Sequence, residues 1–491
     1  MKTKLFFILP VLALVTGCSD YLEHLPDQRT ELNTPEKVAE LVATAYPRAN
    51  YITFLEAMSD NAEDKALSGG ELINREPWFF NDVPDRNEDT PDYYWFAAYT
   101  AIAAANHALE AIGQAPDPEE YQASKGEALV ARAYTHFMLV TLFSRVYNPA
   151  TAASDPGIPY VTEPEKQVTK PYARGTVASV YEQIEQDLLA GIPLLDNMSY
   201  KEGAGKYHFT TSAAHAFASR FYLFKQDYAR VVEHANLAFP GGVILPSLRP
   251  INSAAYRALE PAVKLAEYTK ADVPANLLLV ETPSLWARSL RGYRYGFSSH
   301  MLRTFIWDDN VTGGLWGYMF YGNEQTLFTP KFREHFVKED PNADFGSPYN
   351  MVPLLTAEEV LFNRAEANAR LGQYDAALQD LNDFASTRII VNDYDAPYYD
   401  PAQHVITRPR MLSFHATQDL EAALIQTVLD FKRVEFLCEG LRWFDILRHR
   451  LPVVHTPYNR ENIMTLGPND PRRVIQIPQE AQMAGLELNP R

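Results

Sequence analysis

Apolar residues recur at helical spacing over most of the chain. The stretch from Pro35 to Tyr46 shows the pattern, because its apolar positions are three or four residues apart. Thr34 is placed to cap this helix, and Pro35 suits its first turn. The same spacing predicts further helices at Tyr93–Ile112, Glu119–Val146, Thr176–Leu195, Thr211–Lys225 and Asp227–Phe239. We therefore expect a mainly α fold.

Two helix pairs resemble each other. One runs from Ala216 to Ala229 and the other from Ala365 to Leu378. In both, small residues line the first helix, a tight turn follows, and Tyr and Ala open the second helix, which is the tetratricopeptide pattern. No fixed period links the pairs, so we predict degenerate tetratricopeptide-like helix pairs that form a scaffold over about 35–240 and 353–450.

Other parts of the chain lack this spacing. Residues 50–92 are irregular, and prolines and glycines multiply over 241–352. Between Trp286 and Tyr321, ten of thirty-six residues are aromatic, against 12% in the whole chain. We expect 241–352 to be a loop-rich insertion, and 451–491 to be an irregular C-terminal segment.

The first residues predict export and a lipid anchor. Two lysines precede an apolar run from Leu5 to Val15, which is too short to span a bilayer and is typical of a signal peptide. Thr16 and Gly17 then lead into Cys18 in the form of a lipobox. We therefore expect a signal peptide over 1–17, lipidation of Cys18, and a single domain over 18–491 that is anchored to a membrane by its acyl chains.

Charge and motifs exclude several functions. A net charge of −18 with no basic stripe argues against nucleic acid as a partner. The sequence contains none of the usual hydrolase, zinc-enzyme or nucleotide motifs. Gly203–Lys206 resembles half a phosphate loop, but Tyr207 replaces the needed hydroxyl residue. The acidic clusters Asp60–Asp64 and Asp308–Asn310 fit solvated loops better than calcium sites. We expect no catalytic residue, no metal and no cofactor.

One segment is more specific. Asp430–Arg448, which includes Glu435-Phe-Leu-Cys-Glu439-Gly440-Leu-Arg442-Trp443, closely resembles the C-terminal signature of the RagB/SusD family of outer-membrane nutrient-binding lipoproteins. Further similar segments, in the same order, are Asn106, Gly126–Tyr134, Gly157–Tyr160, Arg174–Tyr181 and Val474–Pro490. The resemblance implies a glycan-binding lipoprotein that is not an enzyme. It would sit on the outer membrane, facing the exterior, and pass oligosaccharide to a SusC-like TonB-dependent transporter.

The charges of this segment allow two interpretations. Glu435, Glu439, Arg442, Asp445 and Arg448 are three or four residues apart, a spacing that predicts ion pairs along one helix face. Two carboxylates one turn apart also fit the acid–base pair of a glycosidase. Because arginines accompany them, a structural charge network is the favoured interpretation.

A sugar binder needs exposed aromatic planes beside hydrogen-bonding groups. The resemblance implies that loops in two regions of the chain, one of them the loop-rich insertion at 241–352, carry the ligand surface, without naming their residues. From these regions we select as candidates Trp78, Asn81, Trp95, Trp286, Tyr293, Arg294, Tyr295, Trp307, Asp309, Trp316 and Tyr318. Two other functions stay open: the same architecture with peptide as cargo, and a tetratricopeptide scaffold for envelope assembly, which predicts no ligand-sized aromatic cleft.

Overall fold

The computed structural model describes residues 31–165, 172–391 and 398–491. The predicted signal peptide and Cys18 lie outside these residues. The helices are α2 (Pro35–Val42), α3 (Ile52–Met58), α4 (Leu72–Trp78), α5 (Pro91–Gln114), α6 (Gln122–Phe143), α7 (Val177–Gly191), α8 (Thr211–Lys225), α9 (Tyr228–Leu237), α10 (Ala254–Arg257), α11 (Pro261–Tyr268), α12 (Trp286–Ser289), α13 (Ser299–Met301), α14 (Ala357–Arg370), α15 (Tyr374–Arg388), α16 (Pro401–His404), α17 (Arg408–Phe414), α18 (Leu420–Glu435), α19 (Arg442–Arg448) and α20 (Gln479–Met483).

The strands are short by comparison and are β1 (Glu63–Asp64), β2 (Asn276–Pro283), β3 (Tyr295–Gly296), β4 (Leu315–Trp316), β5 (Glu334–Lys338), β6 (Gly346–Thr356), β7 (Ile389–Ile390), β8 (Val453–His455) and β9 (Met464–Leu466). The mainly α fold is thus confirmed, and the helix predicted at Thr211–Lys225 has those bounds. Thr34 caps α2 as predicted, since its side chain accepts from the N–H of Lys37.

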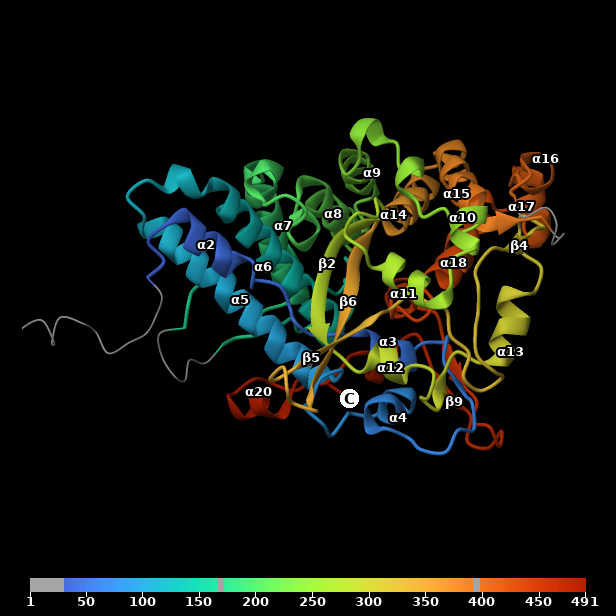
Figure 1. Ribbon diagram of the computed structural model, residues 1–491, viewed down its shortest axis with the longest axis horizontal. Helices are drawn as coiled ribbons and strands as arrows, with labels where there is room; N and C mark the ends of the chain where they lie inside the picture. The colour runs from blue at the N-terminus through green and yellow to red at the C-terminus, as the bar shows by residue number, and fades with distance from the viewer. Residues whose placement is uncertain (1–30, 166–171, 392–397) are drawn as a thin grey trace, which may run out of the picture.

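The first helices form one wall of the molecule. In Figure 1, α2, α5, α6 and α7 lie to the left of β2 and β6, and the helices from α14 to α18 lie to the right. Helices α6 and α7 approach closely because a Cβ at Gly126 would lie 2.9 Å from the Gly191 carbonyl oxygen. Arg132 on α6 also donates two hydrogen bonds of 2.7 Å to Asp187 on α7. Glycines at this crossing therefore allow the close contact between the two helices.

The two similar helix pairs are α8–α9 and α14–α15, and they pack against each other although about 120 residues separate them in the chain. The guanidinium of Arg220 on α8 is buried and paired with Glu359 on α14, with 2.5 Å between Nη2 and Oε2. It also donates to the carbonyl of Leu354 at 2.7 Å. The pairs thus form one stack whose members are joined through the core.

The region 241–352 is more regular than predicted. Strands β2, β6 and β5 form an antiparallel sheet in that order, and β2 and β6 run down the middle of the molecule (Figure 1). The apolar stretch of β2, Leu277–Val280, is buried and packs against α8. Residues 50–92, predicted to be irregular, contain α3 and α4. The sequence did not predict these elements, because most of them are too short to show a period among prolines and acidic residues.

Motifs that are far apart in the sequence meet in the structure. Arg132 donates to Asn106 at 2.8 Å, which joins α6 to α5. Arg174 donates to the carbonyl of Gly157 at 2.8 Å and to Asn489 at 2.6 Å, so the closing segment of the chain is held beside the start of α7. Along the described ranges, no helix is both long and apolar enough to cross a membrane.

Candidate functional site

Trp78 joins the two aromatic regions that the sequence singled out, but it does so inside the protein. It ends α4, and its side chain is fully buried. Its ring stacks on Tyr295 with centroids 4.3 Å apart and on His455 with centroids 4.8 Å apart. Asn74 fixes this arrangement through a 2.8 Å hydrogen bond to the carbonyl of Tyr295. The structure therefore brings the two regions together, yet neither Trp78 nor Tyr295 presents a ring to a ligand.

Four of the six other aromatic candidates are also core residues: Trp95, Trp286, Tyr293 and Trp316 are buried. The indole of Trp286 donates to the Cys438 carbonyl at 3.2 Å, and Trp316 packs edge-on against Phe431 at 5.2 Å. The hydroxyl of Tyr318 donates to Glu435 in the interior. Large aromatic rings contribute more apolar burial to a core than other side chains do. In this fold these residues pack in the core and do not form the ligand contacts that we predicted.

Trp307 is different. All six tryptophans lie within the described ranges, and Trp307 alone is exposed, with 62% of its surface accessible. It follows a π-helical turn, η7 (Leu302–Ile306), whose apolar residues Leu302 and Ile306 are buried. Such turns are rare and recur at functional sites. Beneath it, Phe305 lies 4.4 Å from the guanidinium of Arg433 on α18. The exposed indole thus projects from a firmly anchored turn.

Strand β1 connects this turn to a second exposed aromatic side chain. Glu63 of β1 accepts a 2.8 Å hydrogen bond from Nδ1 of His300, which lies in α13 just before the turn. The next residue, Asp64, is bound by the predicted Arg294 at 2.7 Å and by the N–H of Tyr458 at 3.1 Å. Tyr458 is 72% exposed. Tyr458 was not among the predicted site residues, because it lies in the irregular C-terminal segment.

We name Glu63, Asp64, Arg294, His300, Trp307 and Tyr458 the aromatic surface. Burial raises the pKa of Asp64, but hydrogen bonds from Arg294 and from the backbone of Tyr458 outweigh it, so this pKa lies below its usual range. The carboxylate is therefore charged at neutral pH, but its side chain is only 2% exposed, whereas that of Arg294, which it binds, is 35% exposed. In Figure 1, α13 lies at the right end of the molecule and α2 at the left end.

Asn81 and Asp309, the remaining candidates, are exposed. Asp309 lies two residues after Trp307 and belongs to the same loop. Asn81 lies elsewhere, in a cleft of about 430 Å³ between residues 77–92 and the C-terminal residues 472–491. Asp82 and Arg491 close one side of this cleft with a 2.8 Å ion pair. The site candidates therefore divide between two surfaces, and only the one around Trp307 offers an exposed tryptophan.

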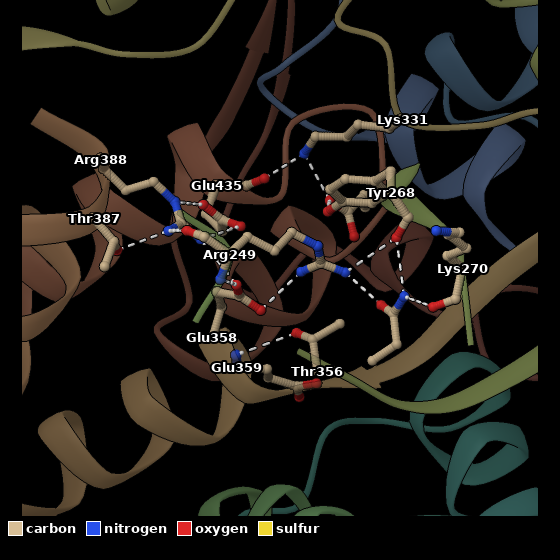
Figure 2. A network of polar contacts seen from close by, with 12 residues as sticks. Arg249, Tyr268, Lys270, Lys331, Thr356, Glu358, Glu359, Thr387, Arg388 and Glu435 are labelled. Carbon is tan, nitrogen blue, oxygen red and sulfur yellow. Dashed lines mark hydrogen bonds and ion pairs between the residues drawn. The ribbon is translucent and has the colours of Figure 1, made fainter. Parts of the chain in front are cut away.

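Glu435 belongs to a buried network of polar contacts that Figure 2 shows in detail. Arg388 donates to Glu435 at 2.7 Å and to Glu358 at 2.9 Å, and Arg249 donates to the other oxygen of Glu358 at 2.8 Å. These four side chains are at most 2% exposed. Burial raises the pKa of Glu435, but the charge and hydrogen bonds of Arg388 overcome this and lower it to about 2.

The charges of the signature do not lie along one helix face, contrary to our prediction. Helix α18 ends at Glu435 and α19 begins at Arg442, with Cys438 (φ 66°) and Gly440 (φ 73°) reversing the chain between them. Four of the charges have distant partners instead, and the fifth pairs within the segment: Glu435 with Arg388, Glu439 with Lys331, Arg442 with Asp60, Arg448 with Glu366, and Asp445 with Lys432 of the same segment. The favoured charge network is thus present, and neither glutamate is accessible to a substrate.

The two acidic clusters do not converge on a cation position. Asp60 is bound by Arg442, and Glu63 by His300 and Ser298. Among the residues that the structure describes, no three His, Cys, Asp or Glu side chains are grouped so as to hold a metal ion. Asn310 uses its amide within its own loop, donating to the carbonyl of Gly314 at 2.7 Å.

A stack of helix pairs joined by buried ion pairs, with exposed aromatic residues at one end, defines this chain as a helical-repeat scaffold that presents a surface. Two family models match it. One is described as starch-binding and associating with the outer membrane and covers residues 20–223, and the other is described as the SusD family and covers residues 323–488. The chain belongs to the SusD family, as its signature segment indicated.

Solved structures share the fold along nearly the whole chain. A putative sugar binding protein from Bacteroides vulgatus is 19% identical, with a TM-score of 0.68 over 94% of this chain and 99% of that one. A SusD superfamily protein from Bacteroides thetaiotaomicron is 19% identical, with a TM-score of 0.66 over 92% and 98%. A laminarin binding SusD-like protein is 15% identical, with a TM-score of 0.63 over 93% and 99%. No curated protein matches the chain.

Proposed function

We propose that this protein is a cell-surface binding protein, without catalytic activity of its own, that captures oligosaccharide on the aromatic surface. The observation that carries the proposal is the exposure of Trp307. Exposure of an indole to water is unfavourable, and the other five tryptophans are buried. The exposed position of Trp307 on an anchored turn is therefore best explained by a ligand that covers the ring. The C–H face of a sugar ring is such a ligand.

Polar side chains of the aromatic surface suit the hydroxyl groups of a sugar. Arg294, His300 and Glu63 are exposed over 35%, 66% and 36% of their side chains. Tyr458 adds a second exposed aromatic ring. The sugar-binding and laminarin-binding descriptions of proteins with this fold support the same ligand class.

A calorimetric panel tests this proposal. The full-length protein is titrated with laminari-oligosaccharides, malto-oligosaccharides, host and plant glycans, and short peptides. Stacking on an aromatic plane contributes about 0.5–1.5 kcal/mol beyond area burial, so Trp307→Ala should weaken glycan binding about two- to ten-fold. Tyr207→Ala is the matched control, because Tyr207 is an exposed aromatic residue at the end of another segment, η4 (Gly205–Tyr207). Equal affinities in wild type and Trp307→Ala would contradict the proposal.

Membrane anchoring and delivery complete the proposed function. Cys18 would carry the lipid that holds the protein on the outer membrane, facing the exterior, where a SusC-like TonB-dependent transporter receives the captured oligosaccharide. The description of the N-terminal family model as associating with the outer membrane supports this location. Cys18→Ala should move the protein to the soluble fraction after a high-salt wash. Retention of that variant in the membrane would argue against the anchor.

One observation favours peptide as a second candidate cargo. Strand β5 is an edge strand of the central sheet, and Phe336 and Val337 on it are about 40% exposed. A free edge can pair with an extended peptide through backbone hydrogen bonds. Tight binding of short peptides that is unaffected by Trp307→Ala would favour this candidate over glycan.

A further inference from the structure

A cavity of about 520 Å³ opens on a part of the molecule that the proposed function does not use. It lies between the C-terminal end of α6, the end of α19 and residues 468–474. Its charged lining consists of four arginines and two aspartates, and one serine completes the set that we name the arginine cavity: Ser144, Arg145, Asp155, Arg448, Arg450, Asp470 and Arg473. Local positive charge is notable here because the chain as a whole carries −18.

Two of the arginines have carboxylate partners. Arg448 is paired with Glu366 at 2.5 Å, and Arg145 faces Asp155 at 3.7 Å. These pairs leave little charge for a ligand. The aspartate at the other end of the cavity, Asp470, is likewise held by Arg472 at 2.7 Å, outside the lining.

Arg473 and Arg450 are not neutralised in this way. Arg473 is buried, and within the described residues its guanidinium donates only to backbone carbonyls, among them Leu451 at 2.8 Å and Ile446 at 2.5 Å. Burial and the nearby charge of Arg450 lower the pKa of Arg473 to about 10, although the charge of Asp470 opposes this. Arg450 is exposed, and its side chain donates to the neutral Asn469. A buried cation without a carboxylate partner is costly unless an anion compensates it.

An independent observation comes from the floor of the cavity. Ser144 is 3% exposed, and its hydroxyl has no hydrogen-bond partner among the residues that the structure describes. Buried hydroxyls are nearly always hydrogen-bonded. Asn148 and Gln226 add uncharged polar groups to the same lining. The cavity therefore offers an unused hydroxyl and amides beside two arginines that lack counter-charges.

We propose that the arginine cavity is a second binding site, which takes an oxyanion carried on a hydroxyl-rich body such as the carboxylate of an acidic sugar. The planar guanidinium groups match the geometry of a carboxylate or a sulfate. The volume lies in the range of small-ligand pockets. This site shares no residue with the aromatic surface, so variants of each can be tested separately.

Calorimetry of the full-length protein with three probes at constant ionic strength tests the proposal. Sodium glucuronate should bind and glucose should not. Arg450→Gln should weaken glucuronate binding at least five-fold. Arg460→Gln is the matched control, because Arg460 is also an exposed arginine with a positive φ (57°) in the C-terminal part of the chain, outside this cavity. Sodium sulfate is the third probe: binding that equals glucuronate and depends on Arg450 assigns a free oxyanion, and weaker binding assigns an acidic sugar.

Two results would overturn the proposal. One is the absence of binding of both glucuronate and sulfate at millimolar concentration. The other is an equal loss of affinity in Arg450→Gln and Arg460→Gln, which would show a general effect of charge. A thermal unfolding curve first shows that Arg450→Gln is folded. If it is not, Arg450→Lys takes its place, because it keeps the charge but loses the planar guanidinium and should still weaken glucuronate binding.

Discussion

The signature segment, Asp430–Arg448, and the aromatic segment, Trp286–Tyr321, both contain many residues of the kinds that perform chemistry. In the signature segment, the side chains of the five regularly spaced charges are at most 9% exposed, and each is bound in an ion pair, in four cases with a residue outside the segment. In the aromatic segment half of the ten rings are buried as well, but a π-helical turn places Trp307 in solvent. A segment rich in charged or aromatic residues thus indicates a ligand surface only where the backbone exposes one of these side chains to solvent.

The largest effect should come from breaking the buried network of the signature segment. Arg388→Met removes the guanidinium that binds Glu435 and Glu358 and leaves both carboxylates buried. We expect a loss of about 3–5 kcal/mol in the free energy of unfolding, measured by urea denaturation. Arg408→Met is the control, because its ion pair with Asp375 is exposed and should contribute little. Similar losses in the two variants would show that burial of the network is unimportant.

A second prediction concerns pH. Burial raises the pKa of Glu56 and of Asp89 to about 7, from ordinary values of 4.5 and 3.8. Both carboxyls therefore favour the folded state fully below about pH 4, and this contribution is lost as the pH rises through 7. The pKa of Glu435 is lowered to about 2, so its contribution is complete above about pH 4.5 and changes only in stronger acid.

The free energy of unfolding of the wild type should consequently fall between pH 5 and 8. Glu56→Gln should make this fall smaller, by at most about 3 kcal/mol. The amide can still accept from the N–H groups of Cys438 and Gly440, which Glu56 binds at 2.9 and 3.0 Å. Glu40→Gln, at an exposed glutamate of α2, is the control. Urea curves at four pH values provide the comparison. A slope that is the same in both variants would mean that Glu56 does not titrate in this range.

The third prediction separates backbone strain from packing in the signature segment. Gly440 has a φ of 73°, and a Cβ there would lie 3.1 Å from the Cα of Ile52 on α3. Gly372 has almost the same φ of 72°, and a Cβ there would meet nothing within 4 Å. Gly372→Ala should therefore cost only the strain, about 1 kcal/mol, and Gly440→Ala about 1–3 kcal/mol. Equal losses would show that the contact with α3 does not constrain the turn.

Sequence reasoning predicted the scaffold well because long helices leave a period. The helices α5, α6, α7, α8 and α9 were all expected close to their observed bounds. It missed α3, α4 and the sheet of β2, β6 and β5, whose elements are short and whose partners are distant in the chain. The burial of Trp78 could not be predicted, because a hydrophobic core and a sugar-binding site both use large aromatic side chains. Tyr458 could not be found either, since only the fold brings it to Asp64.

The most direct test of the central claim uses the fluorescence of the tryptophans themselves. Because Trp307 is the exposed one of six, acrylamide should quench mainly its emission. A glycan that binds at the aromatic surface should protect this emission, with the protection following the calorimetric saturation curve. In Trp307→Ala, both the quenchable fraction and the protection should disappear. Saturating glycan binding that leaves the quenching of the wild-type protein unchanged would contradict the account.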